Sequence, residues 1–212
     1  MTFDEYLTRW SGLHGDAQVT SPIRVWLRAT FVLAMPFRVL SPNIITLTGL
    51  LYAAVIVVVD ARFGLGTGWL AAAILLMGVI DSLDGIVAAV TGRTTSFGSF
   101  LDSVVDRGVD VAIALLLYQH GAPIAPVLSA ICFTLIHEYM RARALGLGLK
   151  DVGIITVAEK PTRIAIGVMF FLACSLLPQH GHVLVAVAVY VWSALALLAC
   201  AQLFINIKNR LG

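Results

Sequence analysis

Charged residues are scarce in this chain of 212 residues, since Asp, Glu, Lys and Arg together make up only 12% of it. Hydrophobic residues make up 59%, and the mean hydropathy is +0.94. A water-soluble domain needs a polar surface around its core, and this composition does not supply one. The sequence therefore predicts an integral membrane protein.

Cysteine is also rare, no internal repeat is obvious, and we expect no cleavable leader. Cys132, Cys174 and Cys200 all fall in apolar runs, where a free cysteine behaves as a small apolar residue, so we assign them no redox or metal role. Residues 1–20 contain no apolar stretch of the kind found in a signal peptide. The expected location is the inner (cytoplasmic) cell membrane or an equivalent bilayer, crossed several times.

Apolar runs long enough to cross a bilayer, which takes about 20 helical residues, occur six times. They cover residues 42–60, 66–90, 98–118, 122–144, 161–178 and 183–206. Membrane-spanning strands would be shorter and would alternate in polarity. We therefore expect an all-α integral membrane protein with six transmembrane helices, divided into an N-terminal cytoplasmic or interfacial segment, 1–40, and a membrane domain, 41–212.

Lys and Arg are distributed unevenly around these spans. One side of the membrane would carry Arg9, Arg24, Arg28, Arg38, Arg93, Arg141, Arg143, Lys150, Lys160, Arg163, Lys208 and Arg210. The other side would carry only Arg62, and Arg107 lies inside a span. Because basic residues favour the cytoplasmic side, we expect both termini to be cytoplasmic.

The stretch "SPIRVWLRATFVLAMPFRVL", residues 21–40, interleaves Arg24, Arg28 and Arg38 with apolar residues. This pattern suits an amphipathic helix that lies in the membrane interface before the first span. An ordinary basic flank of that span would have a similar composition, so both interpretations stay open.

Five aspartates interrupt the second and third apolar runs, in "DSLDGIVAAVTGRTTSFGSFLDSVVDRGVD" from Asp81 to Asp110. A carboxylate near the bilayer centre costs about 2.5–3.5 kcal/mol. Arg93 and Arg107 are the only cations nearby in the sequence, and two cations cannot neutralise five anions. The acids therefore need another compensating charge, although we interpret Asp110 itself as a structural hydrogen-bonding or ion-pairing residue.

The spacing of the other four aspartates predicts that they converge. If the connection 91–97 reverses the chain, two antiparallel helices place Asp84 level with Asp102 and Asp81 level with Asp106. Residues three or four apart share a helix face, so all four carboxylates would approach one pocket. Hard oxygen ligands of this kind suit Mg²⁺, Mn²⁺ or Ca²⁺, and two ions about 3.5–4 Å apart would match phosphoryl-transfer sites.

The complete pattern, Asp81-x2-Asp84-Gly85-x2-Ala88 followed by Gly98-x3-Asp102-x3-Asp106, resembles the signature D-x2-D-G-x2-A-R-x8-G-x3-D-x3-D of the CDP-alcohol phosphatidyltransferase family. The resemblance implies a six-helix membrane fold and the transfer of a phosphatidyl group from a CDP-linked lipid, CDP-diacylglycerol, to an alcohol with release of CMP. It also implies two Mg²⁺ or Mn²⁺ ions, a homodimer, an active site that opens to the cytoplasm, and membrane lipids but no nucleic acid as partners.

The same resemblance assigns roles to the motif residues. Asp81, Asp84 and Asp102 would be metal ligands, and Asp106 would be both a ligand and the general base on the acceptor hydroxyl. Gly85, Ala88 and Gly98 would line the cytidine diphosphate site, although packing of small residues between helices would also explain the two glycines. The pattern departs from the family at Ala89, where an Arg is usual. Arg93 would compensate by reaching back one helical turn, unless Thr91 and Gly92 break the helix first.

The acceptor alcohol is less well defined. The stretches "FLDSVVDRGVD", "HEYMRARALGLG" and "AEKPTR" resemble those of bacterial phosphatidylinositol-phosphate synthases, which implies that Arg141, Lys160 and Arg163 hold the phosphate of inositol phosphate. Glycerol 3-phosphate or phosphatidylglycerol, as in a cardiolipin-type synthase, would use similar cations, and all three residues are also consistent with basic flanks that contact lipid headgroups. An ion-coupled transporter and an inactive family member remain the alternatives of another class.

Overall fold

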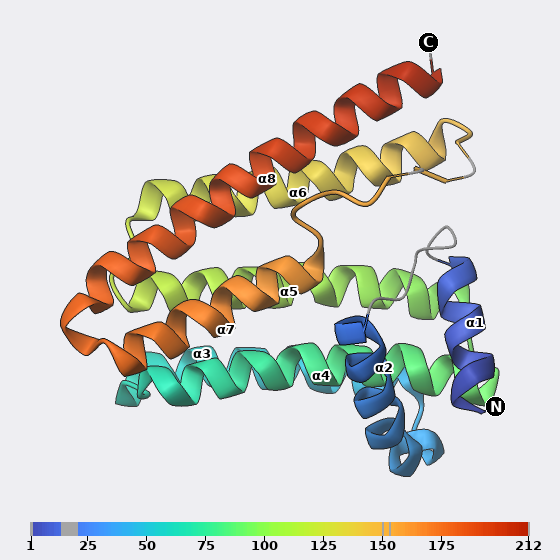
Figure 1. Cartoon of the computed structure of the whole chain (residues 1–212), viewed down its shortest axis with the longest axis horizontal. Coiled ribbons are helices and arrows are strands. Elements are labelled where there is room, and N and C mark those ends of the chain that lie inside the picture. Colours follow the sequence, from blue (N-terminus) through green and yellow to red (C-terminus); the bar gives the residue numbers. More distant parts are fainter. Residues whose placement is uncertain (1, 14–20, 150, 153, 212) are drawn as a thin grey trace. The chain divides into compact units, whose positions relative to one another are not determined.

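The computed structural model describes residues 2–13, 21–149, 151–152 and 154–211 of the chain (Figure 1). Lys150, one of the expected cytoplasmic basic residues, lies outside this part. All regular secondary structure in the described residues is helical, which confirms the all-α part of the predicted class. The elements are α1 (Phe3–Leu13), α2 (Ser21–Ala34), η1 (Met35–Val39), α3 (Pro42–Phe63), α4 (Thr67–Thr91), α5 (Ser96–Gln119), α6 (Ile124–Gly146), α7 (Lys160–Leu176), η2 (Pro178–His180) and α8 (Gly181–Leu211).

Each of the six apolar runs predicted from the sequence corresponds to one helix, from α3 to α8. Three helical stretches of the described chain are long and apolar enough to cross a membrane, namely Pro42–Phe63, Thr67–Thr91 and Pro178–Leu211. Helices α5, α6 and α7 fall short for different reasons: α5 carries several charged residues, the C-terminal part of α6 contains Glu138, Arg141 and Arg143, and α7 has only 17 residues.

The chain forms two compact units, which we describe separately. Unit 1 comprises Met1–Tyr52 and Met77–Asp106, and unit 2 comprises Ala53–Leu76 and Arg107–Gly212. Unit 1 therefore contains α1, α2, the first half of α3, the second half of α4 and the start of α5. It holds the four aspartates of the motif.

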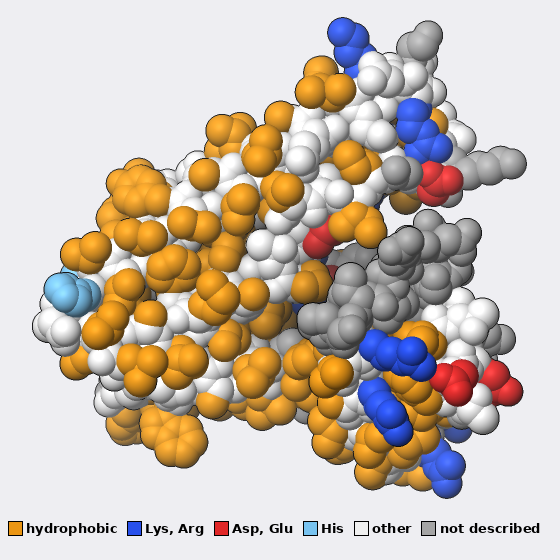
Figure 2. All heavy atoms as spheres, in the orientation of Figure 1, with side chains coloured by type: hydrophobic (Ala, Val, Ile, Leu, Met, Phe, Trp, Pro, Cys, Tyr) orange, Lys and Arg blue, Asp and Glu red, His pale blue; other side chains and the backbone are white. Residues whose placement is uncertain are grey.

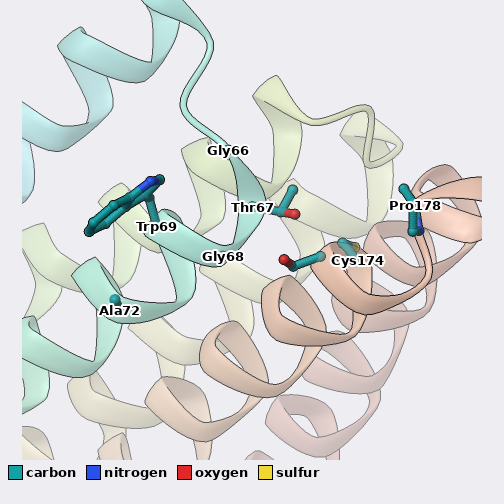
Figure 3. A pocket seen from close by; sticks show the side chains of 8 residues that line it. Gly66, Thr67, Gly68, Trp69, Ala72, Cys174 and Pro178 are labelled. Atoms are coloured by element: carbon teal, nitrogen blue, oxygen red, sulfur yellow. The ribbon is translucent and has the colours of Figure 1, made fainter.

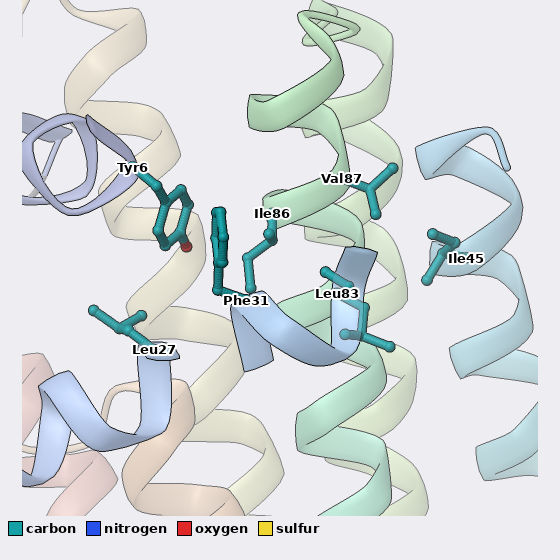
Figure 4. Packing of buried hydrophobic residues seen from close by; sticks show 8 residues of the cluster. Tyr6, Leu27, Phe31, Ile45, Leu83, Ile86 and Val87 are labelled. Atoms are coloured by element: carbon teal, nitrogen blue, oxygen red, sulfur yellow. The ribbon is translucent and has the colours of Figure 1, made fainter. Parts of the chain in front are cut away.

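An apolar cluster joins the N-terminal helices of unit 1 to α3 and α4 (Figure 4). Its buried members are Tyr6, Leu27, Phe31, Ala34, Ile45, Leu83, Ile86 and Val87. The Phe31 ring lies 5.6 Å from that of Phe3 and 5.5 Å from that of Tyr6, measured between ring centroids, and burial raises the pKa of Tyr6 to about 12. Helix α1 thus has a packing role that the sequence analysis missed, although Phe3, Tyr6 and Leu7 have the helical spacing that indicates it.

Helix α2 divides its residues between this cluster and the surface. Leu27 and Phe31 are buried in the cluster, whereas Val25, Val32 and Leu33 are more than half exposed. The helix predicted within residues 21–40 is therefore present and presents apolar side chains outward as well as inward.

Unit 2 is built around α8, which packs along both α6 and α7 (Figure 1). The indole Nε1 of buried Trp192 donates a hydrogen bond to Thr134 Oγ1 at 3.2 Å. Large hydrophobic side chains cover the visible outer face of this unit (Figure 2), and exposed residues of α7 and α8 include Leu172, Tyr190 and Phe204. Such a surface suits contact with lipid rather than water.

A buried carboxylate also stabilises the connection between α3 and α4 in unit 2. Asp60, which is 5% exposed, accepts a hydrogen bond from the backbone N–H of Leu65 at 2.8 Å and contacts the His120 ring nitrogen at 3.1 Å. These contacts explain how an acid is accommodated inside the otherwise apolar helix α3.

Candidate active site

Three of the motif aspartates come together in unit 1. Asp81 of α4 and Asp102 and Asp106 of α5 each offer a carboxylate oxygen, and these oxygens all lie within 4.8 Å of one another. All three side chains are half-buried. The predicted convergence of two helices is thus confirmed for these three acids.

The turn between α4 and α5 produces this register. Helix α4 ends at Thr91, and Gly92 follows with φ +67°, a left-handed conformation that glycine adopts without strain. The N–H of Arg93 donates to the Ala88 carbonyl at 3.0 Å, which is the six-residue closure of a Schellman motif. Thr95 then caps α5, because its Oγ1 accepts a hydrogen bond from the N–H of Gly98 at 3.0 Å.

The fourth motif acid, Asp84, is not part of this group of three. Its side chain is buried, with the residue 6% exposed, and its Oδ2 accepts a hydrogen bond from Thr46 Oγ1 of α3 at 2.6 Å. Thr46 is not evident as a site residue in the sequence. A hydroxyl within an apolar run is a weak signal, and no local spacing indicates which acid it meets.

The two motif glycines differ in their surroundings. A Cβ atom on Gly98 would lie 3.1 Å from Asn43 Oδ1, which is tighter than an ordinary contact. A Cβ on Gly85 would meet no atom within 4 Å. Gly98 therefore has a packing reason to be glycine, whereas the space next to Gly85 is open.

The basic residues assigned to the acceptor lie in unit 2, and two of them have carboxylate partners. Arg163, which is 2% exposed, donates from Nε to Asp110 Oδ1 at 2.8 Å and from Nη1 to the Ala158 carbonyl at 2.6 Å. The structural role predicted for Asp110 is thus confirmed. Lys160 is the first residue of α7 and is half-buried.

Arg141 pairs with Glu159, which immediately precedes α7. Arg141 Nη2 lies 2.7 Å from Glu159 Oε1, and the same oxygen accepts hydrogen bonds from the N–H and the hydroxyl of Thr156 at 2.9 Å. Burial alone would raise the pKa of Glu159, but the hydrogen bonds from Arg141 and Thr156 outweigh burial and lower the pKa below its usual value. The segment before α7 is therefore tied to α6 by a charged contact.

A second set of polar contacts lies beside this one in unit 2. Arg107 Nη1 contacts Glu138 Oε1 at 2.8 Å, and buried His137 shares a hydrogen bond between its Nε2 and Thr156 Oγ1 at 3.0 Å. Arg107, Arg141 and Arg163 thus each have an acidic partner from another part of the unit. This pairing accounts for charged side chains among otherwise apolar helices.

The sequence matches the family model for CDP-alcohol phosphatidyltransferase over residues 39–192. The chain belongs to the CDP-alcohol phosphatidyltransferase family. The match includes the whole aspartate motif, and the three converging carboxylates lie within the matched region.

Two similar proteins align with part of this chain. The chain is 39% identical over 128 residues to the archaetidylinositol phosphate synthase of Methanothermobacter thermautotrophicus, covering 60% of this chain and 64% of that protein. It is 35% identical over 136 residues to the phosphatidylinositol phosphate synthase of Mycolicibacterium smegmatis, covering 60% of this chain and 59% of that protein. The chain thus spans about three fifths of the length of these relatives.

A solved structure shows the same fold. The phosphatidylinositol phosphate synthase of Mycobacterium tuberculosis, crystallised with CDP-DAG bound, superposes with a TM-score of 0.67 over 85% of this chain and 94% of that one, at 23% sequence identity. The same enzyme was also crystallised with manganese and citrate, and that structure matches equally well, with a TM-score of 0.67.

Ala89, where the chain departs from the family signature, packs against the apolar cluster of unit 1. Arg93 does not lie on the same helix, because α4 ends at Thr91. Its Nη1 instead donates to the Leu40 carbonyl at 3.3 Å. The packing around Ala89 gives a physical reason for a small apolar residue at this position.

A cavity of about 560 Å³ lies in unit 2 where α4 begins and α7 ends (Figure 3). Its walls are formed by Gly66, Thr67, Gly68, Trp69, Ala72, Cys174, Ser175 and Pro178. None of these residues carries a charge, and none belongs to the family motif. The lining is therefore poorly suited to a diphosphate or to a divalent cation.

Proposed function

We propose that this family member transfers a phosphatidyl group from CDP-diacylglycerol to the hydroxyl of inositol phosphate and releases CMP. The observation that carries this proposal is the convergence of Asp81, Asp102 and Asp106 within 4.8 Å, at the spacing of the family signature. The names of the relatives, archaetidylinositol phosphate synthase and phosphatidylinositol phosphate synthase, support inositol phosphate as the acceptor.

The donor set fits a divalent metal. Carboxylate oxygens are the preferred ligands of Mg²⁺ and Mn²⁺, and three such groups so close together repel one another unless a cation lies among them. We propose that Asp81, Asp84, Asp102 and Asp106 hold two such ions, which would neutralise the diphosphate and polarise the phosphorus under attack. Asp106 would also take the proton from the acceptor hydroxyl.

The remaining motif residues would form the nucleotide side of the site. Open space beside Gly85 leaves room for a ligand next to the α4 backbone, and Ala88 and Gly98 would line the same site. Arg93 is exposed at the start of the turn, where its charge would favour an anionic ligand. These roles rest on the family motif.

We propose that Arg141, Lys160 and Arg163 contact the phosphate of the acceptor. Arg141 is the more accessible of the two arginines, with 29% of its side chain exposed compared with 2% for Arg163. Arg163 would need to rearrange its contacts with Asp110 to reach a ligand, so its assignment depends most on the family resemblance. Glycerol 3-phosphate and phosphatidylglycerol are the alternative acceptors.

For the membrane arrangement we propose six spans, α3 to α8, with both termini cytoplasmic and the active site open to the cytoplasm of a cell with an inner membrane. Helix α2 would lie in the interface, since it combines exposed Val25 and Val32 with Arg24 and Arg28. A homodimer is proposed on the family resemblance alone.

The test is CMP release by the purified full-length chain, supplied with CDP-diacylglycerol, Mn²⁺ or Mg²⁺, and in turn inositol phosphate, glycerol 3-phosphate and phosphatidylglycerol. We expect release with inositol phosphate and none when the metal is chelated. No release with any acceptor would contradict the proposal. Binding of the nucleotide lipid without turnover would indicate an inactive family member, and cation flux in liposomes without the lipid would indicate a transporter.

A further inference from the structure

We propose that Thr46 of α3 is a positioning residue of the metal centre, whose hydroxyl orients the Asp84 carboxylate for metal binding. This inference rests on the proposed function, in which Asp84 is a metal ligand. The family signature takes its acids from α4 and α5 only, so the proposal adds a third helix to the site.

The contact between the two side chains is short and buried. Thr46 Oγ1 lies 2.6 Å from Asp84 Oδ2, and the two residues are 5% and 6% exposed. An ionised carboxylate can only accept a hydrogen bond, so the threonine hydroxyl is the donor. The distance is typical of a charge-assisted O–H···O⁻ bond, which is about twice as strong as a neutral one.

Helix α3 packs closely against its neighbours on both sides of Thr46. Asn43, Thr46 and Gly49 follow one another at intervals of three residues and therefore lie along one face of the helix. A Cβ on Gly49 would lie 3.2 Å from Ile80 Cγ2 of α4, so the glycine permits a close approach of the two helices one turn beyond Thr46. One turn before Thr46, Asn43 Oδ1 lies 3.1 Å from the position that a Cβ on Gly98 of α5 would take.

Carboxylates that bind metals are usually held by hydrogen bonds of this kind, which fix the plane of the ligand group before the ion arrives. Without the hydroxyl, the Asp84 side chain would sample other rotamers, and each binding event would have to select the productive one. Loss of such an outer partner typically lowers metal affinity about 10–100-fold.

A matched control is available on the same helix. Thr48 Oγ1 donates to the Ile44 carbonyl at 2.8 Å, and Thr46 Oγ1 likewise lies 3.0 Å from the Pro42 carbonyl. Both hydroxyls therefore lie close to a carbonyl of the preceding turn, but the single hydroxyl hydrogen of Thr46 is donated to Asp84, whereas exposed Thr48 donates to backbone. Thr48→Val removes a hydroxyl and this backbone contact without touching a motif acid.

The experiment is a titration of the purified full-length protein with Mn²⁺, in which free Mn²⁺ is followed by electron paramagnetic resonance. We expect Thr46→Val to weaken Mn²⁺ binding about 10–100-fold, and Thr46→Ser and Thr48→Val to bind like the wild type. Thr46→Ala replaces Thr46→Val if the latter loses the wild-type gel-filtration profile. Wild-type Mn²⁺ affinity in the folded Thr46→Val or Thr46→Ala protein would overturn the inference.

The dependence of CMP release on Mn²⁺ concentration is a second measurement, and it distinguishes positioning of a metal ligand from a purely structural role. CMP release by Thr46→Val should recover when Mn²⁺ is raised, with the half-saturating metal concentration shifted by the same factor as the affinity. A rate that stays low at every Mn²⁺ concentration would contradict positioning. Wild-type protein that binds Mn²⁺ but releases no CMP would overturn the proposed function and leave the inference on Thr46 intact.

Discussion

One carboxylate oxygen of Asp81 lies within 4.8 Å of one from Asp106, although the two residues belong to different helices. The left-handed Gly92 and the Thr95 cap set the register that brings them level. With Asp102 alongside, the arrangement concentrates negative charge in a half-buried position. A divalent cation is the simplest compensation for this charge.

Metal binding should therefore stabilise the folded protein. Because the ion binds the native acids and not the unfolded chain, Mn²⁺ at about 100 times its dissociation constant should add about 2.7 kcal/mol to the free energy of unfolding. Thermal unfolding in detergent, with Mn²⁺ or with a chelator, measures the shift. Asp102→Asn should lose most of the shift, whereas Asp4→Asn, at a position whose side chain is 85% exposed, should keep it. Equal melting temperatures with and without metal in the wild type would count against the metal centre.

Gly85 distinguishes a ligand site from a packing site. An added Cβ would meet no protein atom within 4 Å, and Ala favours a helix interior over Gly by about 0.5–1 kcal/mol. Gly85→Ala should therefore leave stability equal or higher, while the KM for CDP-diacylglycerol rises about tenfold or more because the methyl group occupies ligand space.

Gly146→Ala is the matched control for this change, since Gly146 also has no atom within 4 Å of the added Cβ and lies in a helix. It should change neither KM nor stability appreciably. If Gly85→Ala also keeps the wild-type KM, Gly85 does not line the nucleotide site.

Ala89→Arg, which introduces the Arg usual in the family, should raise neither the stability of the protein nor its rate of CMP release. Ala89 packs against the cluster that holds α1 and α2, so Ala89→Arg would force a guanidinium into an apolar contact and should lower the free energy of unfolding by about 1–3 kcal/mol. Ala89→Leu adds bulk without charge, so it separates the effect of side-chain size on stability from the effect of the buried charge. Chemical unfolding and CMP release are the measurements. Faster CMP release by Ala89→Arg would show that the missing Arg limits activity.

The Arg141–Glu159 pair predicts a pH dependence of stability. The pKa of Glu159 is lowered in the folded state from its usual 4.5, so the stability it contributes is complete above pH 4.5 and is lost as the pH falls through the folded-state pKa. Glu159→Gln should therefore lower the free energy of unfolding at pH 7, and the difference from the wild type should shrink below pH 4.5.

Asp151→Asn is the control for this pair. Asp151 contacts Arg210 at 2.8 Å, but 68% of its side chain is exposed, so its loss should have little effect at any pH. Denaturant titrations of the three proteins between pH 7 and pH 3 provide the comparison. A constant difference between Glu159→Gln and the wild type over this range would refute the assignment.

The sequence predicted those features that depend on local spacing. Six apolar runs became helices α3 to α8, since run length and composition determine where a membrane helix can form. The approach of Asp81 to Asp106 followed from the distance of each residue from a Thr/Gly/Ser turn. Both features can be predicted without knowing how any other helix packs against them.

The sequence did not predict contacts between residues that are far apart in the chain. Thr46 meets Asp84 and Arg163 meets Asp110 because of how α3 and α7 pack, and no periodicity identifies such partners. For the same reason the sequence shows Ala89 only as a departure from the motif, and its packing against the apolar cluster of unit 1 is seen only in the structure.

The most direct test of the central claim is CMP release by the wild type and by Asp106→Asn, measured with CDP-diacylglycerol, inositol phosphate and saturating Mn²⁺. Asp106→Asn keeps the size of the side chain but removes both the charge that we propose binds metal and the base that we propose takes the proton. We expect release by the wild type and a loss of about 10²-fold or more in the variant, which should keep the wild-type gel-filtration profile. Release by Asp106→Asn at the wild-type rate would contradict this claim.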